Sequence, residues 1–124
     1  MGAVRFPPRF AEGIRHFNAG AFFEAHEAFE DLLDEVEGDP RWDLLVALIQ
    51  IAVGYHKGVA GHPGAVRMLR LGGEKLERFP AVVYGVAVEQ LRQRVMDDAA
   101  LLAAGDPPGT HPTHLQPRIV MTRG

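Results

Sequence analysis

Cysteine is absent from the 124-residue sequence. Its absence excludes disulfides and thiolate metal sites, and it fits the reducing cytoplasm, where disulfides are rare. Excess positive charge is also lacking, because the formal net charge is -3 and the pI is about 6.0. Since proteins that bind DNA or RNA are usually basic, we expect no nucleic-acid partner.

Long apolar runs are missing as well. The longest, from Leu44 to Tyr55, is interrupted by Gln50 and is shorter than the roughly 20 residues of a membrane-spanning helix. The first residues do not combine basic side chains with an apolar run, as a secretory signal would. No phosphate-binding loop, catalytic triad or His-Glu-x-x-His metal motif occurs in the sequence. These absences predict a cytoplasmic protein with no membrane contact and no cofactor.

What the sequence does contain is helical periodicity over most of its length. Apolar residues recur at spacings of three and four, in stretches separated by glycine and proline. The expected helices cover residues 7–17, 21–37, 41–60, 63–78 and 83–104. They should pack as one all-α, antiparallel bundle domain, residues 1–104, with the third helix at its centre. Gly72-Gly73 in the fourth helix indicate either a closely approaching neighbour or a kink.

Two pairs of these helices have similar turns, at Ala19-Gly20 and at Ala60-Gly61. The pairs resemble tetratricopeptide-type helical hairpins in packing style, and such hairpins often form grooves that bind peptides. Residues 105–124 contain four prolines and no periodicity, so we expect an extended or disordered tail. Within it, Ile119-Val120-Met121 should dock, either on their own bundle or across a two-fold axis on a second subunit.

The most aromatic and most acidic part of the chain is the stretch from Phe17 to Asp34. His26 breaks its pattern, because at 100° per residue it falls on the apolar stripe of the predicted helix. Glu30 lies one turn further on, where a carboxylate and an imidazole can hydrogen-bond or share a ligand. We therefore expect both side chains to be largely buried, with His26 reaching a polar group of the third helix. The candidates for that group are Gln50, Tyr55 and His56.

The run Phe-Asn-x-Gly-x-Phe-Phe-Glu-Ala-His-Glu-x-x-Glu, residues 17–30, resembles the signature of a small helical family of bacteria and archaea. That family is the domain of unknown function numbered 309. The block from Leu48 to His56 resembles its next helix, including a Gln and an aromatic–His pair, and the similarity extends over roughly residues 10–103. Members often carry Trp where this chain has Leu33. The resemblance implies an all-helical fold and no assigned activity.

The candidate functional cluster consists of His26, Glu27, Glu30, Gln50, Tyr55 and His56. One interpretation is structural: a hydrogen-bonded polar island that sets the register of two packed helices. The other is a site, either for a metal ion or for acid–base chemistry in a pocket. Metal sites in helical bundles use Glu-x-x-His, so a metal bound by His26, Glu30 and His56 is the weaker alternative. His111 and His114 offer two further ligands, without a third.

Two functions follow from these patterns. The first is a non-enzymatic binding or scaffold module, because helical hairpins present grooves and the chain lacks a catalytic motif. Its partners would be a second copy, giving a homodimer, or another protein or peptide. The alternative is a small hydrolase, metal-dependent or acid–base, that uses His26, Glu30 and His56. The run from Glu24 to Asp43 holds nine of the sixteen acidic residues. It is either a solvated face or a contact for a basic partner or for the chain's own basic face.

Overall fold

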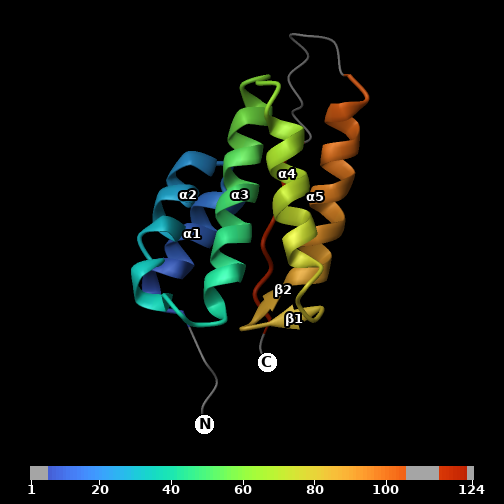
Figure 1. Cartoon of the computed structure of the whole chain (residues 1–124). Helices are drawn as coiled ribbons and strands as arrows, with labels where there is room; N and C mark the ends of the chain where they lie inside the picture. Colours follow the sequence, from blue (N-terminus) through green and yellow to red (C-terminus); the bar gives the residue numbers. More distant parts are fainter. Residues whose placement is uncertain (1–5, 106–114, 123–124) are drawn as a thin grey trace.

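The computed structural model describes residues 6–105 and 115–122. Its helices are α1 (Pro8–Asn18), α2 (Phe22–Glu30), α3 (Arg41–Val59), α4 (Ala65–Leu76) and α5 (Val88–Ala103). A 3-10 turn (Asp34–Val36) follows α2, and two short strands, β1 (Val82–Val83) and β2 (Val86–Ala87), precede α5. Each helix packs against the next one in the chain, as Figure 1 shows. The predicted all-α bundle is confirmed.

Glycine turns join the helices of the two hairpins α1–α2 and α3–α4. Gly20 and Gly61 have φ angles of 80° and 72°, a left-handed conformation that glycine adopts without steric cost. Each follows the residue that caps the first helix of its hairpin, Ala19 after α1 and Ala60 after α3. The two hairpins therefore turn in the same way, as the similar turn sequences predict.

The helix α2 is shorter than the predicted helix over residues 21–37. Its last regular bond runs from the amide of Asp31 to the carbonyl of Glu27. After it, the amides of Leu32, Leu33, Glu35 and Val36 reach back only three residues. Acidic side chains crowd this end, and the last turn of α2 has no basic residue. Because the C-terminal end of a helix carries partial negative charge, this sequence disfavours a longer helix.

Residues 82–87 form an antiparallel ribbon where the sequence predicts the start of a helix at residue 83. The turn of the ribbon holds Tyr84 (φ 52°) and Gly85 (φ 78°), which are both left-handed. Two left-handed central residues define the type I′ turn, whose twist suits a two-residue hairpin. The signal in the sequence was valine on both sides of this glycine-containing turn, because β-branched residues favour strands.

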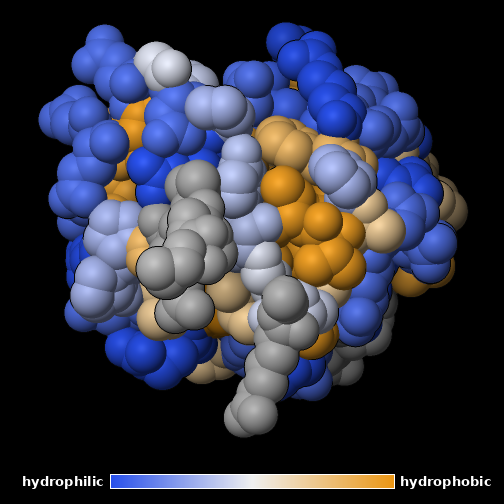
Figure 2. Space-filling model, turned by 90° about the horizontal axis from the view of Figure 1, so that it is seen from below, coloured by the Kyte–Doolittle hydropathy of each residue, from blue (hydrophilic) through white to orange (hydrophobic). Residues whose placement is uncertain are grey.

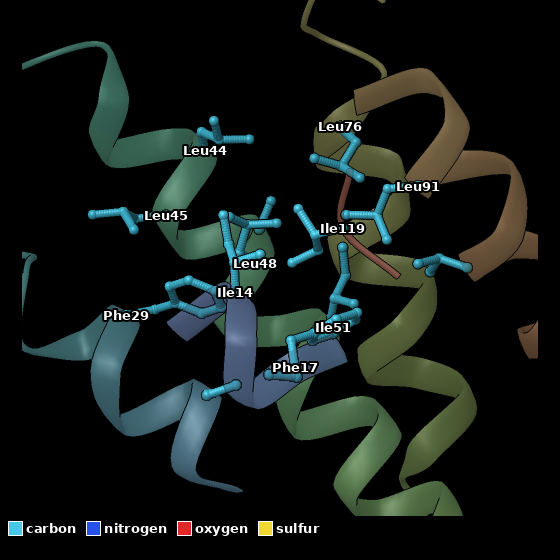
Figure 3. Packing of buried hydrophobic residues seen from close by; sticks show 14 of the residues in the cluster. Ile14, Phe17, Phe29, Leu44, Leu45, Leu48, Ile51, Leu76, Leu91 and Ile119 are labelled. Carbon is cyan, nitrogen blue, oxygen red and sulfur yellow. The ribbon is translucent and has the colours of Figure 1, made fainter. Parts of the chain in front are cut away.

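The core is one apolar cluster with α3 at its centre, as predicted. Leu44, Leu48 and Ile51 of α3 are fully buried, and so are Phe17 of α1 and Phe29 of α2. Figure 3 shows these side chains converging on α3 from the neighbouring helices. Among residues 6–105 and 115–122, no helix combines the length and the apolar character needed to cross a membrane.

The helix α4 approaches α3 closely at Gly72. A Cβ atom at this position would lie 2.5 Å from Cγ1 of Ile51 and 2.9 Å from the carbonyl oxygen of Ala47. No side chain fits into that space, because real Cβ atoms do not come so near to other heavy atoms. The helix also runs through Gly72-Gly73 without interruption. Of the two predicted explanations for these glycines, the structure shows the close neighbour.

The end of the molecule that carries the ribbon has an exposed apolar surface. Val82 of β1 is 49% exposed, and Met121, which forms a bridge with Val86 of β2, is 48% exposed. Figure 2 views the molecule from this end and shows apolar surface beside hydrophilic surroundings. The ribbon therefore leaves part of its apolar surface in contact with water.

Candidate functional site

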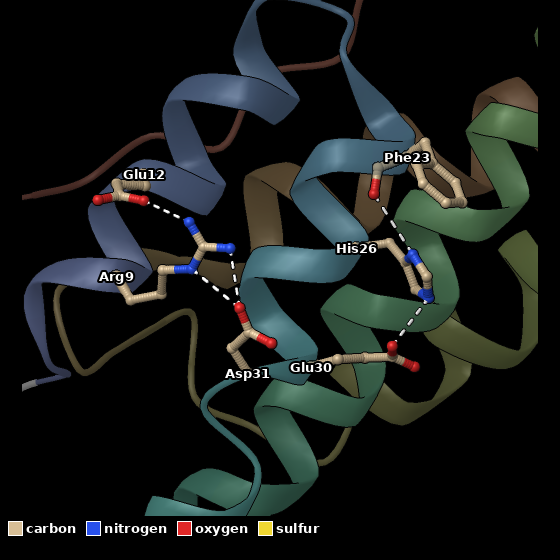
Figure 4. Close-up of polar contacts among 6 residues, drawn as sticks. All are labelled: Arg9, Glu12, Phe23, His26, Glu30 and Asp31. Carbon is tan, nitrogen blue, oxygen red and sulfur yellow. Dashed lines mark hydrogen bonds and ion pairs between the residues drawn. The ribbon is translucent and has the colours of Figure 1, made fainter.

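His26 and Glu30 form a pair on the surface of α2. Nε2 of His26 lies 3.2 Å from Oε1 of Glu30, and the two side chains are 19% and 51% exposed. Nδ1 of His26 lies 3.3 Å from the carbonyl oxygen of Phe23 in the same helix. Figure 4 shows both contacts. The predicted pairing is confirmed, whereas the predicted burial is wrong for Glu30 and only partly correct for His26.

Both ring nitrogens of His26 therefore face oxygen atoms of their own helix. A neutral imidazole carries a single N–H, so it donates to only one of the two oxygens. A general base or a metal ligand needs a ring nitrogen whose lone pair points at a proton or at the metal ion. The nitrogens of His26 point instead at Glu30 and at the backbone of Phe23. This geometry favours a structural role for His26 within α2.

The predicted hydrogen bond from His26 to the third helix is wrong, since its polar contacts both lie on α2. The link to α3 is aromatic: the ring centroid of Phe23 lies 5.5 Å from that of His26 and 5.6 Å from that of His56. Phe23 itself is 47% exposed, and His56 and Glu27 are exposed as well. The physical reason is that His26 sits at the edge of the helix interface, where a carboxylate one turn away reaches the ring.

Tyr55 belongs to the core and not to the surroundings of His26. Its ring is stacked on that of Phe22 with centroids 5.2 Å apart, and its hydroxyl donates a 2.5 Å hydrogen bond to Oδ2 of Asp98. Asp98, on α5, is 2% exposed and also accepts a hydrogen bond from Nε of Arg94 at 2.9 Å. Burial first, and then the hydrogen bond to Asp98, raise the pKa of Tyr55. This buried pair ties α3 to α5.

Sequence reasoning missed Asp98. It stands in an Asp97-Asp98 pair on an amphipathic helix, a pattern typical of a solvated helix face. The only signal was position, because Val95 and Ala99 on either side of it belong to the apolar stripe and are buried. A tyrosine on another helix could not be identified as its partner from that stripe.

Gln50 is partly buried on α3, and its Oε1 atom is buried without a hydrogen-bond partner. In the part of the chain that the structure describes, no three His, Asp or Glu side chains form a group that could hold a metal ion. The set His26, Glu30 and His56 is thus not assembled as a three-ligand site. His111 and His114 lie outside the described residues.

The acidic run finds its arginine partners close by. Asp31 accepts from Nη2 and Nε of Arg9 on α1, at 2.8 and 3.2 Å, and Glu12 pairs with the same guanidinium. Figure 4 shows Arg9 between the two carboxylates. Asp39 pairs with Arg41, which holds the pKa of that carboxyl below its usual range. The exposed pair of Arg9 and Asp31 contributes little to stability, whereas the pair of Asp39 and Arg41 is partly buried.

Asn18, the last residue of α1, holds the C-terminal segment by the backbone of that segment. Its Nδ2 donates to the carbonyl oxygen of Ile119 at 3.0 Å, and its Oδ1 accepts from the amide of Ile119 at 2.7 Å. One side-chain amide thus satisfies both polar groups of an extended residue, as a neighbouring strand would. Sequence reasoning did not identify this role of Asn18, because nothing local reveals a partner 101 residues away.

Within the C-terminal segment of residues 115–122, residues 115–119 alternate between buried and exposed positions. Leu115, Pro117 and Ile119 are buried, whereas Gln116 and Arg118 between them are exposed. A period of two is that of an extended chain with one face on the core. The predicted docking is therefore confirmed for Ile119, which packs within its own chain. Val120 is only partly buried, and the predicted burial is wrong for Met121, whose side chain is 48% exposed. The homodimer stays a prediction.

This segment lies between α3 and α5, in what we call the tail groove: the surface formed by Asn18, Gly58, Leu91 and Leu102 together with β2. A Cβ at Gly58 of α3 would be 3.3 Å from Leu115 and 3.3 Å from Leu102 of α5. Further along, Figure 3 shows Ile119 between α3 and Leu91 of α5, within the same apolar cluster. The groove is thus lined by both helices along its length.

At its far end the segment pairs with β2 through an isolated antiparallel bridge between Met121 and Val86. The amide of Ala87 donates to the carbonyl oxygen of Val120 at 2.9 Å, and the amide of Thr122 donates to that of Gly85 at 2.7 Å. These bonds pair the backbone of the segment with β2 on the side opposite β1. Backbone pairing at this end and the Asn18 side chain therefore hold the segment independently of its side chains.

The comparison with curated proteins found no match for this chain. Residues 10–69 match the sequence profile of the family described as "Domain of unknown function (DUF309)". The matched residues include most of α1 and all of α2 and α3, and with them Asn18, His26 and Gln50. This match confirms the resemblance that the run at residues 17–30 carries: residues 10–69 of the chain are similar to the DUF309 family.

Proposed function

We propose that this protein is a non-enzymatic helical binding module whose tail groove takes an extended peptide segment. The observation that carries the proposal is the pair of hydrogen bonds between Asn18 and the backbone of Ile119. Recognition of main-chain N–H and C=O groups is how proteins bind extended peptides by strand addition. In the isolated chain, residues 115–122 fill the groove in this way.

The helical architecture supports the same proposal. Stacked helical hairpins leave grooves that are suited to extended chains. Here α4 packs against both α3 and α5. The C-terminal segment contacts α3 at Gly58 and lies beside Leu91 of α5. Over residues 115–119 the buried side chains are apolar and the exposed side chains, Gln116 and Arg118, are polar. That arrangement is typical of a bound peptide with one buried face.

The hydrolase alternative has less support from the geometry. Its base would be His26, whose ring nitrogens both face oxygens of α2. Its second histidine, His56, is exposed on α3 and contacts the ring of Phe23. An acid–base mechanism needs a group whose lone pair or proton points at the substrate. His26 would have to leave both of its present contacts to meet that requirement.

Peptide complementation tests the proposed function. The chain is shortened to end at Gly105 and is titrated with a synthetic peptide of residues 115–122, with calorimetry and thermal melts as readouts. We expect the peptide to bind and to raise the melting temperature, because the same contacts form between separate chains. If the shortened chain is unfolded by itself, a gain of helical circular dichroism on adding the peptide reports the same binding.

The matched control is the shortened chain with Asn18→Ala. Loss of two hydrogen bonds to the peptide backbone should weaken binding about tenfold or more. A shortened chain that neither binds the peptide nor changes its melting temperature or helicity at about 1 mM peptide, a weak affinity limit, contradicts the proposed function.

A further inference from the structure

The tail groove treats neighbouring positions of its occupant differently. Ile119 is 2% exposed and Leu115 is 4% exposed, and Pro117 between them is buried. Gln116 and Arg118 point to water. A surface that held only the backbone would leave all five positions alike. This groove instead selects every second side chain, so it has a preference in sequence and not only in conformation.

Each inward position meets a wall that suits the residue found there. Leu115 packs where α3 has Gly58, and the missing side chain of that glycine makes the room for it. Ile119 enters the apolar cluster that contains Leu91, so a polar or charged side chain at this position would lose its water without gaining a partner. Each of these two subsites therefore favours an apolar side chain.

The position of Pro117 has its own physical reason. A buried amide needs a hydrogen-bond partner, and proline has no amide hydrogen to satisfy. The fixed φ angle of proline also keeps the segment extended before it binds, which lowers the entropy lost on binding. Since Pro117 is buried between two apolar anchors, the groove favours proline midway between Leu115 and Ile119.

The resident segment has an advantage over any external one. It is joined to α5 through residues 106–114, and a short tether of this kind gives an effective concentration on the order of millimolar. An external segment with the same contacts binds only by displacing it. The groove is thus occupied by default and open to a competitor that is abundant nearby or makes additional contacts.

On the basis of the proposed function, we infer that the tail groove is a site for a partner protein that carries an extended Leu-x-Pro-x-Ile segment, with residues 115–122 of this chain as the competing resident. The inward positions require the apolar residues and the proline, because these are buried in the groove. The two positions between them tolerate any residue that water can solvate. Asn18 binds the backbone at the isoleucine position, whichever chain supplies it.

The first experiment measures competition in the full-length protein. A fluorescent peptide of residues 115–122 is titrated with the unaltered chain and with the Ile119→Asp variant, and its anisotropy is followed. We expect at least about tenfold tighter binding to the variant, because its own segment no longer competes. Arg118→Ala is the matched control, since Arg118 is exposed next to Ile119, and it should bind as the unaltered chain does. If Ile119→Asp does not fold, the milder Ile119→Ala variant takes its place.

The second experiment reads the pattern with altered peptides on the same variant. Replacing the leucine, the proline or the isoleucine of the peptide with aspartate should weaken binding about tenfold or more, given the free energy of burying such a side chain. Replacing the glutamine or the arginine with alanine should change the affinity less than about twofold, because exposed side chains contribute little.

The outcomes separate this inference from the proposed function. If no peptide binds to any full-length or shortened chain, both are overturned. If the peptide binds but all five positions matter equally, or if Ile119→Asp binds no better than the unaltered chain, only the inference is overturned. Light scattering of the full chain distinguishes a second copy as the occupant. A dimer that Ile119→Asp abolishes would assign the groove to the tail of another copy and would overturn the partner inference.

Discussion

Two polar residues of the same signature run make contacts of opposite kinds. His26 bonds within α2, to a carbonyl three residues before it and to a carboxylate four residues after it, at the surface. Asn18 bonds to the backbone of Ile119, 101 residues away. The contacts of His26 stabilise one turn of α2, whereas those of Asn18 attach the C-terminal segment to α1. The contribution of a polar residue to stability therefore depends on the sequence separation and the burial of its partner, and not on the range of reactions that its side chain can perform.

The pair of Tyr55 and Asp98, like the contact of Asn18 with Ile119, joins residues that are far apart in the sequence. Its partners are 43 residues apart and the hydrogen bond is buried. Its chemistry resembles that of His26 and Glu30, since in both cases a carboxylate accepts from a neighbouring side chain. The difference between an interior pair and a surface pair can therefore be measured with nearly the same chemical groups.

The largest effect is expected for Asp98→Ala. It leaves the buried hydroxyl of Tyr55 without its acceptor, and the loss of a hydrogen bond to a charged group costs about 2–3 kcal/mol of unfolding free energy. Urea denaturation measures this change. Asp98→Asn is the control, because its side-chain oxygen still accepts from the tyrosine, and it should cost less than the alanine. Equal costs for the two variants would show that the hydrogen bond contributes nothing.

A smaller effect is expected for Asn18→Ala in the full-length chain. The amide and the carbonyl of Ile119 lose their partners in a partly buried place, at a cost of about 1–2 kcal/mol. Hydrogen exchange should also speed up at the amide of Ile119, while the amides of α3 keep most of their protection. Asn18→Asp sharpens the test, because a carboxylate accepts from the amide but cannot donate to the carbonyl. Unchanged exchange at Ile119 would contradict the role of Asn18.

Alkaline pH provides a third test of the interior pair. The pKa of Tyr55 is raised in the folded state, by burial and by the hydrogen bond to Asp98. The unfolded chain releases the tyrosine proton near pH 10, so the unfolding free energy should fall above that pH by about 1.4 kcal/mol per pH unit. Below pH 10 the contribution is fully present. Tyr55→Phe should remove this part of the slope, and a slope that is the same in both proteins would refute the assignment.

The smallest effect is expected for His26→Leu. The exposed pair with Glu30 contributes little, so the unfolding free energy should change by less than about 0.5 kcal/mol. Glu30→Gln, which keeps the size of the side chain, should change it equally little. Thermal melts of both variants suffice. A loss above 1 kcal/mol for either one, larger than surface substitutions usually cause, would place His26 with the interior pairs.

For the candidate cluster, the sequence predicted the relative positions of residues within one helix but not the contacts between helices. Helical periodicity correctly put His26 and Glu30 one turn apart. It could not show that His26 lies at the edge of the interface with α3, because the angular position of a residue on a helix does not reveal what packs there. The same periodicity placed Tyr55 on a buried helix but could not name Asp98 as its partner. The ribbon at residues 82–87 was missed although its turn sequence was visible.

The sequence by itself determined the helices, the glycine turns at Gly20 and Gly61, the central place of α3 and the similarity of residues 10–69 to the DUF309 family. These features depend on local spacing and backbone preferences, which neighbouring residues carry. Only the tertiary structure decided that Asn18 holds Ile119 and that Tyr55 reaches Asp98. Such contacts join residues far apart in the chain, and they form only once packing of the helices has offset the entropy of bringing those residues together.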